Sequence, residues 1–396
     1  MRRLDRLVGL PLCHALTLVR ALLPCRRAAA PPRRILCIQL AEAGSMVLAD
    51  PTLAAIERHG AEPYFVTLAG NAPALCLTGR VPPERIFALR DGSMPRLVAD
   101  AWRLRRWVRQ QEIDAIVDME LFARLTAILA VWCGVSRRAG FHDAAGGALY
   151  RGDLYSDPVR FNPHIHIARN YLRLIEPWFG SDRSGEPLRI RRARPTAAAR
   201  AHVARLLAEL DLQTGGRVVL VNPNASDRLP QRRWPADRYV ELIEQLLAIR
   251  PDVTVLLIGA AEDRATTARI SLQVDRGRCI DIAGRVPLEF LPALFERAHL
   301  LIGNDSGPAH FAAVGELPVV VLFGPETPGL FAPLGPATVL SAGLSCSPCV
   351  SPANQRKSSC TDNRCMQGID VASVLAASLD WLTRTPVRRA VLPVTA

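Results

Sequence analysis

The sequence predicts an α/β fold in which two parallel β-sheets are formed one after the other along the chain. Short apolar segments rich in β-branched residues alternate with longer segments whose apolar residues recur at helical spacing. This alternation is typical of strand–helix–strand crossovers, which join parallel strands. The series is interrupted once, at the polar stretch 181–187 with its Gly and Pro residues, and then starts again. We therefore expect two domains, for which 396 residues are sufficient.

The first domain is expected over residues 31–182. Its apolar strands end in polar turns, and the segments between them have helical spacing. From residue 142 the chain is rich in loops, and it becomes helical again near residue 164. The expected strands are 33–40, 61–69 and 113–120, and a long helix rich in Arg and Trp is expected over 95–111.

The second domain is expected over residues 188–375, followed by a tail at 376–396. A strand and turn at 217–226 lead into an amphipathic helix at 237–250, which carries Val240, Ile243 and Leu247 on one face. Ligands of doubly wound sheets bind beyond the carboxyl ends of the strands, where polar turns occur in this half of the chain. The remaining strands are expected within 252–263, 279–284, 299–307 and 318–328, and a helix is expected over 287–298.

Residues 1–30 are expected to form a basic amphipathic helix. The apolar stretch 7–19 is flanked by arginines and is shorter than the roughly 18 apolar residues of a membrane-spanning helix. Three interpretations stay open: a helix lying on the cytoplasmic leaflet, a helix docked on the protein, and a signal peptide. The net charge of +12 comes almost entirely from arginine. Because no RNA-binding signature or aromatic-interleaved basic run occurs, nucleic acid is not an expected partner.

Four of the ten cysteines are clustered near the end of the second domain. Two, ten and four residues separate them, a spacing compatible with zinc. A disulfide and reduced thiols in a compact loop are the alternatives, and a reducing compartment disfavours the disulfide. The clustered residues are Cys346, Cys349, Cys360 and Cys365.

The stretch Asn-Asp-Ser-Gly-Pro follows the apolar strand that ends near residue 303. Asp305 and Ser306 are good helix N-cap residues, and Pro308 is tolerated in the first turn of a helix. Gly307 has no side chain that would keep a ligand away. Free backbone amides at such a turn suit a phosphate group. An ordinary capped helix is the alternative interpretation.

Several motifs, taken together and in this order along residues 33–370, resemble glycosyltransferase family 9, the heptosyltransferases of lipopolysaccharide assembly. The motifs are ILCIQLAEAGSMVLADPTL, VNPNASDRLPQRRWPADRYVELI, GNDSGPAHFAA and PVVVLFGPETP, followed by CSPC and two further cysteines. The resemblance implies the GT-B fold, in which two Rossmann-like domains face one another across a cleft. It also implies an acceptor site mainly on the N-terminal domain and a nucleotide-sugar site on the C-terminal domain.

The resemblance implies donor-binding roles for residues of the second domain. The family's Asp-Thr-Gly-x-x-His motif matches Asp305, Ser306, Gly307 and His310, which would lie at the sugar and diphosphate. Asn224 and Ser226 would hold phosphate, and Glu262 would contact the ribose. Arg232 lies where the family often has a cation, and a fixed positive charge there would stabilise the departing nucleoside diphosphate.

The first loop departs from the family pattern at the residue that removes the proton from the acceptor hydroxyl. Family members usually have Gly-Asp after the first strand, whereas this chain has Ser45, which is no base at neutral pH. Glu42 lies three residues earlier in the same loop and is our candidate for the catalytic base. Asp118 and Glu120, at the end of another strand, are reserve candidates.

Acceptor contacts are expected from the loop-rich end of the first domain. Arg151 and Tyr155 suit a sugar or a phosphorylated glycolipid. His164 and His166 are spaced to share a metal in a strand, but no third ligand is evident. The family generally needs no metal in catalysis, so no cofactor is expected besides the nucleotide-sugar donor, with ADP-heptose as the family's usual one.

Together these features predict an inverting glycosyltransferase at the cytoplasmic face of a bacterial envelope. It would move a heptose-like sugar to a lipopolysaccharide or another envelope glycan or glycolipid, with membrane contact through the N-terminal helix. Two alternatives stay open. A non-catalytic sugar-nucleotide or glycolipid binder is favoured by Ser45, and a GT-B-like sugar-nucleotide epimerase would act on the donor alone.

Overall fold

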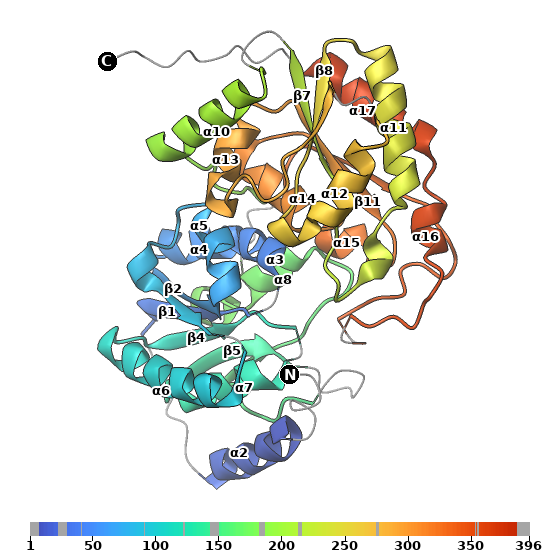
Figure 1. Ribbon diagram of the computed structural model, residues 1–396. Helices are drawn as coiled ribbons and strands as arrows, with labels where there is room; N and C mark the ends of the chain where they lie inside the picture. The colour runs from blue at the N-terminus through green and yellow to red at the C-terminus, as the bar shows by residue number, and fades with distance from the viewer. Residues whose placement is uncertain are drawn as a thin grey trace. The chain divides into compact units, whose positions relative to one another are not determined.

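The chain folds into two compact units, each with its own parallel sheet (Figure 1). Unit 1 comprises Met1–Arg189 with Pro352–Arg356, and unit 2 comprises Ile190–Ser351 with Lys357–Ala396. The computed structural model describes residues 8–22, 30–40, 42–90, 92–121, 123–142, 150–181, 187–212, 216–274, 277–352, 354 and 356–385.

The sheet of unit 1 has six parallel strands in the order β3-β2-β1-β4-β5-β6. The order reverses between β1 and β4, so their carboxyl ends form the switch point at which such sheets bind ligands. Ile38 of β1 pairs with Asp118 of β4, which brings the loops after both strands together. The strands are β1 (Arg34–Ile38), β2 (Glu62–Leu68), β3 (Ile86–Leu89), β4 (Ala115–Asp118), β5 (Arg137–Phe141) and β6 (Asp157–Val159).

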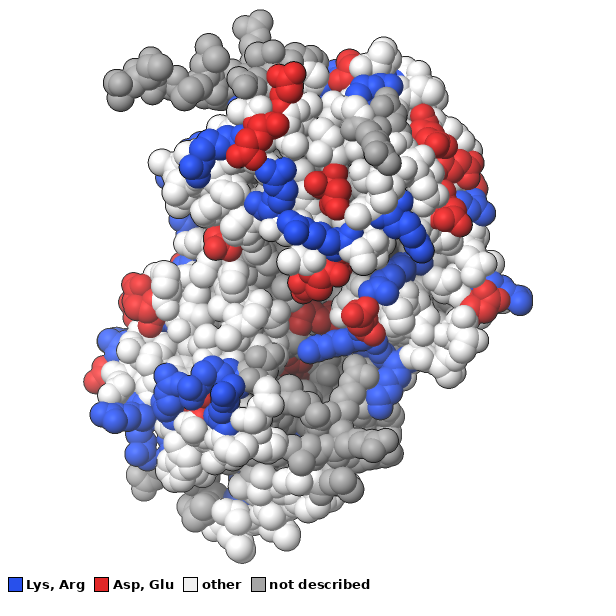
Figure 2. All heavy atoms as spheres, viewed as in Figure 1, with Lys and Arg blue, Asp and Glu red and all other residues white. Residues whose placement is uncertain are grey.

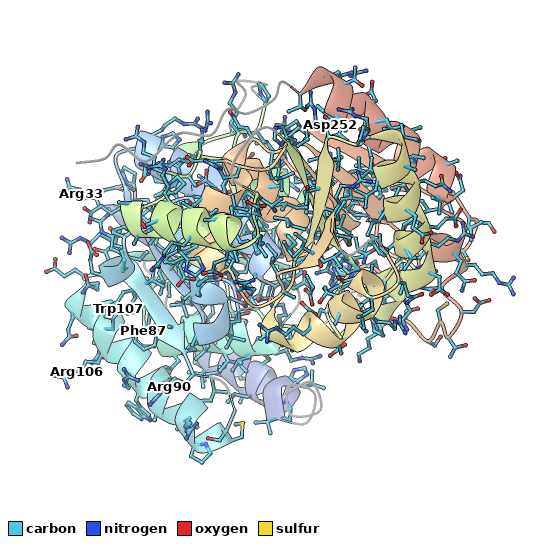
Figure 3. All side chains as sticks on the ribbon, turned by 45° about the horizontal axis from the view of Figure 1, so that its top comes forward. Arg33, Phe87, Arg90, Arg106, Trp107 and Asp252 are labelled. Carbon is cyan, nitrogen blue, oxygen red and sulfur yellow. The ribbon has the colours of Figure 1, made fainter. Side chains whose placement is uncertain are left out.

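The helices of unit 1 cover a sheet that is apolar on both faces, as expected for buried parallel strands. Leu104 and Val108 of α6 pack into the core, and the Trp107 ring lies 5.5 Å from the Phe87 ring (Figure 3). The helices are α2 (Leu10–Leu22), α3 (Ala43–Leu48), α4 (Asp50–Arg58), α5 (Ala72–Cys76), α6 (Met94–Gln110), α7 (Arg124–Trp132), α8 (Ile167–Arg173) and α9 (Glu176–Phe179), with the 3-10 helices η2 (Ala69–Asn71) and η3 (Pro83–Arg85).

The sheet of unit 2 has the order β12-β11-β10-β7-β8-β9 and is also parallel throughout. Its switch point lies between β10 and β7, where Gly303 pairs with Asn222. A Cβ on Gly303 would lie 2.8 Å from the Asn222 carbonyl oxygen, so this position accepts only glycine without a backbone shift. The strands are β7 (Arg217–Asn222), β8 (Val253–Leu257), β9 (Cys279–Asp281), β10 (Leu300–Asn304), β11 (Val319–Phe323) and β12 (Ala337–Ser341).

The last helix of unit 2, α17, begins at Val371 and ends at Arg384. The boundary expected at residue 375 therefore lies inside a helix. This helix belongs to unit 2, since Val374 and Leu382 are buried in the core of the unit. The other helices are α10 (Ala197–Glu209), α11 (Ala236–Ile249), α12 (Arg264–Ser271), α13 (Leu291–Phe295), α14 (Gly307–Phe311), α15 (Pro328–Phe331) and α16 (Arg364–Gln367), with η4 (Pro230–Arg232), η5 (Ala261–Asp263), η6 (Leu288–Phe290) and η7 (Ala312–Gly315).

The predicted α/β class and the two doubly wound parallel sheets are confirmed. Within the expected N-terminal helix, the structure describes only residues 8–22 and residue 30, and α2 occupies most of the described part. None of the helices in the described part of the chain combines the length and hydrophobicity that a membrane crossing requires.

Candidate active site

The carboxyl edge of the unit 2 sheet gathers most of the predicted donor-binding residues. Asn224 follows β7, and Asp305 and Ser306 follow β10 directly. Arg232 ends η4, and His310 lies in α14. All except Ser306 are buried. Strands at a switch point end together, which explains how residues some eighty positions apart in sequence meet here.

Asp305 holds two basic side chains at this edge. Its Oδ2 lies 3.5 Å from Nη1 of Arg232, and its Oδ1 lies 3.7 Å from Nε2 of His310. Because Asp305 is 2% exposed and Arg232 8% exposed, the pair is shielded from water and each charge depends on the other. The carboxylate thereby orients the guanidinium and the imidazole.

Four side-chain atoms at this edge are buried without a hydrogen-bond partner among the described residues: Asn224 Nδ2, Arg232 Nε, Ser306 Oγ and His310 Nδ1. A buried polar atom that lacks a partner is costly, and such atoms are rare in native proteins. The amide nitrogen and the guanidinium nitrogen are donors, and the hydroxyl and imidazole can also donate. The set is suited to an anion rich in acceptor oxygens.

Asn304, the last residue of β10, fixes the loops around this group, although its role was not predicted from the sequence. Its Oδ1 accepts from the backbone N–H of Trp234 and from the Tyr239 hydroxyl, both at 3.1 Å. Its Nδ2 donates to the carbonyl oxygens of Pro223 at 2.9 Å and Asn224 at 3.3 Å. One buried amide thus joins the loop after β7, the start of α11 and β10.

Ser306 and Gly307 differ in part from the capping that the sequence predicts. Ser306 is the N-cap residue of α14, but its side chain makes no capping hydrogen bond, and α14 has only five residues. A Cβ on Gly307 would lie 3.0 Å from Cζ of Phe311, so the ring leaves little space at this position.

Ser226 and Glu262 are exposed on the loops after β7 and β8. The Ser226 hydroxyl accepts from the backbone N–H of Arg228 at 3.3 Å. Near Glu262, the side chain of Asp263 accepts from the Ala260 N–H at 2.8 Å, and burial raises the pKa of Asp263. Neither Ser226 nor Glu262 belongs to the buried group around Asp305.

In unit 1, the residues of the first loop lie at the carboxyl edge of β1. Ser45 is buried and hydrogen-bonds with Tyr171, whose hydroxyl also accepts from Gln39 Nε2 at 2.8 Å. Burial raises the pKa of Tyr171. Ser45 is thus part of a neutral hydrogen-bonded group, which agrees with its being no base. Tyr171 and Gln39 were not expected in this place from the sequence.

Glu42 immediately precedes α3 and has φ 63° and ψ 106°, in the left-handed half of backbone space that residues other than glycine seldom adopt. Its side chain makes no capping hydrogen bond. Oε2 instead forms an ion pair with Nη1 of Arg356, in the short C-terminal segment of unit 1, and the Glu42 side chain is 33% exposed. A carboxylate held on a strained backbone and still accessible to solvent remains a candidate base.

The reserve candidates are less accessible. Asp118 is fully buried and accepts from Nη2 of Arg151 and, at 2.7 Å, from the Tyr155 hydroxyl. Glu120 Oε1 accepts from the Leu40 N–H at 2.5 Å. Asp118 therefore joins the end of β4 to the segment after β5, and Glu120 joins the loop after β4 to the loop after β1.

Arg151 and Tyr155 are not at the surface, where acceptor contacts were expected. Both are almost fully buried beneath the loop after β4, where Asp118 binds them. A Cβ on Gly140 would lie 2.3 Å from the Tyr155 ring, so the packing is tight. This environment argues against an acceptor-binding role and for a structural one, because a buried Arg–Asp pair is costly to separate.

No metal site is formed by the described residues: no three His, Cys, Asp or Glu side chains in those ranges are placed to hold an ion. The four candidate zinc ligands are not joined to one another by disulfides. Cys360 Sγ donates to the Asp362 carbonyl oxygen at 2.9 Å, and burial raises the pKa of Cys365. His166 Nδ1 accepts from the Ala168 N–H at 3.2 Å, so it caps α8, while His164 is exposed.

Comparisons with known proteins show which family the chain resembles. The family model described as glycosyltransferase family 9 (heptosyltransferase) matches residues 101–359. Lipopolysaccharide heptosyltransferase 2 of Salmonella typhimurium is 34% identical over 108 residues, which are 26% of this chain and 30% of that protein. The enzyme of the same name from Escherichia coli is 33% identical over the same shares of both chains. The chain thus matches only 30% of the length of these curated relatives.

Solved structures resemble the fold over most of the chain. A family 9 glycosyl transferase from Veillonella parvula has a TM-score of 0.72 at 19% identity, with 89% of this chain and 98% of that chain covered. The Escherichia coli ADP-heptose lps heptosyltransferase II has a TM-score of 0.69 at 18% identity, with 89% and 99% covered. At these identities the likeness concerns the fold alone.

Proposed function

Because the chain belongs to glycosyltransferase family 9, we propose that it transfers a heptose-like sugar from a nucleoside diphosphate donor to an envelope glycan or glycolipid. The observation that carries this proposal is the buried polar group of Asn224, Arg232, Ser306 and His310, each with one atom that lacks a hydrogen-bond partner among the described residues. A diphosphate would supply acceptor oxygens for these atoms.

On the donor side, Arg232 would stabilise the charge that develops on the leaving diphosphate. Glycosyl transfer breaks the bond between the anomeric carbon and a diphosphate oxygen, and the electron pair stays on that oxygen. A guanidinium held in place beforehand by Asp305 needs little reorganisation during this step. Asp305 is then a positioning residue, because its own charge would repel the diphosphate.

On the acceptor side, we propose Glu42 as the base. The acceptor oxygen forms the new bond to the anomeric carbon while its proton passes to the Glu42 carboxylate. Among the three carboxylates near the ends of β1 and β4, Glu42 is the most exposed, whereas Asp118 and Glu120 are buried and engaged by neighbours. Arg356 has to release Glu42 before the carboxylate can accept the proton.

The names of relatives support the proposed substrates. A fold relative is called an ADP-heptose lps heptosyltransferase, and the sequence relatives are lipopolysaccharide heptosyltransferases. We therefore propose ADP-heptose as the first donor to test, a lipopolysaccharide core as the acceptor, and the cytoplasmic face of the inner membrane as the location. The donor is the only small molecule that this proposal requires.

The test is turnover by the purified full-length chain, with lipopolysaccharide that lacks heptose as acceptor. ADP release would be measured with ADP-heptose, and nucleoside diphosphate release with ADP-glucose and UDP-glucose in parallel. We expect acceptor-dependent release with ADP-heptose. Saturable donor binding without turnover would indicate the non-catalytic binder that Ser45 suggests. Conversion of the donor without acceptor would indicate an epimerase.

A further inference from the structure

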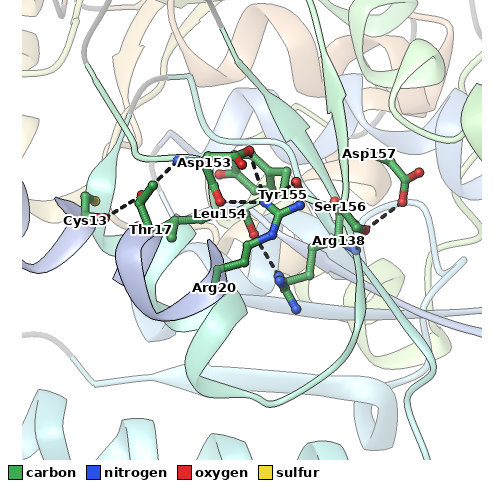
Figure 4. Close-up of polar contacts among 9 residues, drawn as sticks. All are labelled: Cys13, Thr17, Arg20, Arg138, Asp153, Leu154, Tyr155, Ser156 and Asp157. Atoms are coloured by element: carbon green, nitrogen blue, oxygen red, sulfur yellow. Dashed lines mark hydrogen bonds and ion pairs between the residues drawn. The ribbon is translucent and has the colours of Figure 1, made fainter. Parts of the chain in front are cut away.

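Helix α2 is attached to the rest of unit 1 through Thr17 and Arg20, its polar side (Figure 4). Arg20 Nη1 donates to the carbonyl oxygens of Asp153 and Tyr155, both at 2.5 Å, and pairs with Asp153 Oδ1 at 3.1 Å. Thr17 Oγ1 accepts from the Asp153 N–H at 3.0 Å and donates to the Cys13 carbonyl oxygen at 2.7 Å. The only charged residue of the helix is therefore used for attachment.

The opposite side of α2 is apolar and exposed. A helix on the surface of a globular protein normally buries its apolar residues and exposes its polar ones, whereas α2 exposes most of its large apolar side chains. The exposed fractions are 38% for Leu12, 68% for Leu18, 52% for Val19 and 83% for Leu22, and Val8, just before the helix, is 53% exposed.

Helix α6 carries a second exposed apolar stripe. Met94, Val98 and Trp102 recur every four residues, so they lie on one side of the helix, and they are 46%, 53% and 59% exposed. Both helices pack on α7. The Trp102 ring meets the Trp132 ring edge-on at 4.5 Å, and Cys13 of α2 lies in one apolar cluster with Ala127 of α7. Figure 1 shows α2, α6 and α7 at the same end of unit 1.

These two stripes account for most of the large apolar side chains that are exposed in the described part of the chain. Eleven such side chains are exposed there, and eight belong to the stripe of α6 or to α2 with Val8. We call these eight the apolar surface of unit 1. Large apolar side chains that are exposed together at one end of a unit mark a site that another molecule covers.

The charge around the apolar surface identifies the partner. Helix α6 has five arginines and one aspartate, and Figure 2 shows basic side chains gathered over this helix. Residues 1–30 have six arginines and one aspartate. Apolar and tryptophan side chains bordered by arginines suit the boundary between lipid headgroups and acyl chains, and anionic headgroups attract the arginines. A second copy of this chain would instead bring arginine-rich surfaces together.

We propose that the apolar surface of unit 1 binds the face of an anionic lipid bilayer, with α2 lying in the plane of the membrane. The 13 residues of α2 extend only about 20 Å, which is too short to span a bilayer of roughly 30 Å. This inference deepens the proposed function by naming the partner that would bring a glycolipid acceptor to the enzyme, and it rests on that function for this purpose only.

The test is co-sedimentation of the full-length chain with vesicles, without any donor present. Vesicles of phosphatidylcholine alone are compared with vesicles that contain about one third phosphatidylglycerol, because only the latter attract arginines. The double variant L18E/L22E changes α2, and M94E/V98E changes α6. The matched control I249E/L272E changes two exposed apolar residues of unit 2, which are 52% and 63% exposed.

We expect binding to the anionic vesicles only, lowered at least about tenfold by L18E/L22E and by M94E/V98E, and unchanged in the control. Failure of the wild-type chain to bind, or equal weakening of all three variants, would overturn the proposal. So would a wild-type dimer that L18E/L22E converts to monomer in light scattering while vesicle binding is retained. Circular dichroism and the melting temperature check that each variant is folded.

Turnover of a water-soluble, delipidated acceptor separates the two proposals. The L18E/L22E variant should keep wild-type turnover with this acceptor and lose turnover with a vesicle-bound acceptor. If vesicle binding is as expected and neither acceptor is used, the proposed function is wrong, and the proposal that the apolar surface of unit 1 binds a membrane is kept.

Discussion

Replacement of Arg232 by methionine should have two separable effects, one on stability and one on turnover. Arg232 and Asp305 are buried and lie 3.5 Å apart. Removal of the guanidinium takes away one of the two basic side chains near the carboxylate, and the other is His310, at 3.7 Å. Breaking a buried ion pair costs about 3–5 kcal/mol, and this pair is long for a hydrogen bond. We therefore expect R232M to lower the free energy of unfolding by about 3 kcal/mol.

The effect on turnover follows from a different interaction. Arg232 is proposed to stabilise the leaving diphosphate, and loss of one such preorganised group lowers kcat by about 10²–10³, or roughly 3–4 kcal/mol of transition-state stabilisation. The double variant R232M/D305N removes both charges of the pair. It should therefore regain stability to within about 1 kcal/mol of wild type while turnover stays low.

Urea unfolding and steady-state release of the nucleoside diphosphate measure the two effects. Arg228 provides a matched control, since it is an exposed arginine of the same loop, and R228M should leave both quantities nearly unchanged. If R232M retained kcat within about threefold of wild type, Arg232 would not act on the leaving group. If R232M/D305N were as unstable as R232M, the buried pair would not be the source of the instability.

Three further predictions concern other sites. N304A removes four hydrogen bonds that join the loops around the candidate donor site, so the free energy of unfolding should fall by about 2–4 kcal/mol, and donor affinity measured by titration calorimetry should fall with it. E42Q should lower kcat by at least about a hundredfold at unchanged donor affinity, and wild-type turnover in this variant would remove Glu42 from the mechanism. Arg90 lowers the pKa of Asp100 to about 2. The ionised carboxylate therefore adds stability that is present above the unfolded pKa of about 3.9 and is lost as the pH falls towards 2, so R90M should flatten acid unfolding in this range, monitored by circular dichroism.

The architecture could be predicted because it depends on local patterns. Strands of a parallel sheet are buried on both faces, so stretches such as 300–304 and 319–323 are almost purely apolar, and their ends are visible where polar turns begin. The same patterns placed Asn224, Asp305 and Ser306 at strand ends. Since parallel strands end at one edge, the meeting of these residues followed from the topology.

Other parts of the site could not be predicted. Arg151 and Tyr155 have the composition of a binding surface, yet both are buried against Asp118, more than thirty residues away. In the sequence Asn304 is an ordinary strand end, and only the fold brings it against Trp234 and Tyr239. Polar side chains carry no periodic signal that distinguishes a partner inside the protein from one in solvent.

The sequence by itself determined the two sheets, the positions of the polar turns and the departure from the family pattern at Ser45. The local spacing of apolar residues is enough to show which segments are buried as strands and helices. Only the tertiary structure decided that Glu42 pairs with Arg356, 314 residues away, and that α2 turns its polar side inward. These contacts join segments distant in sequence. The energy of a charge depends on which partner the fold brings within a few ångströms, and no local pattern encodes that distance.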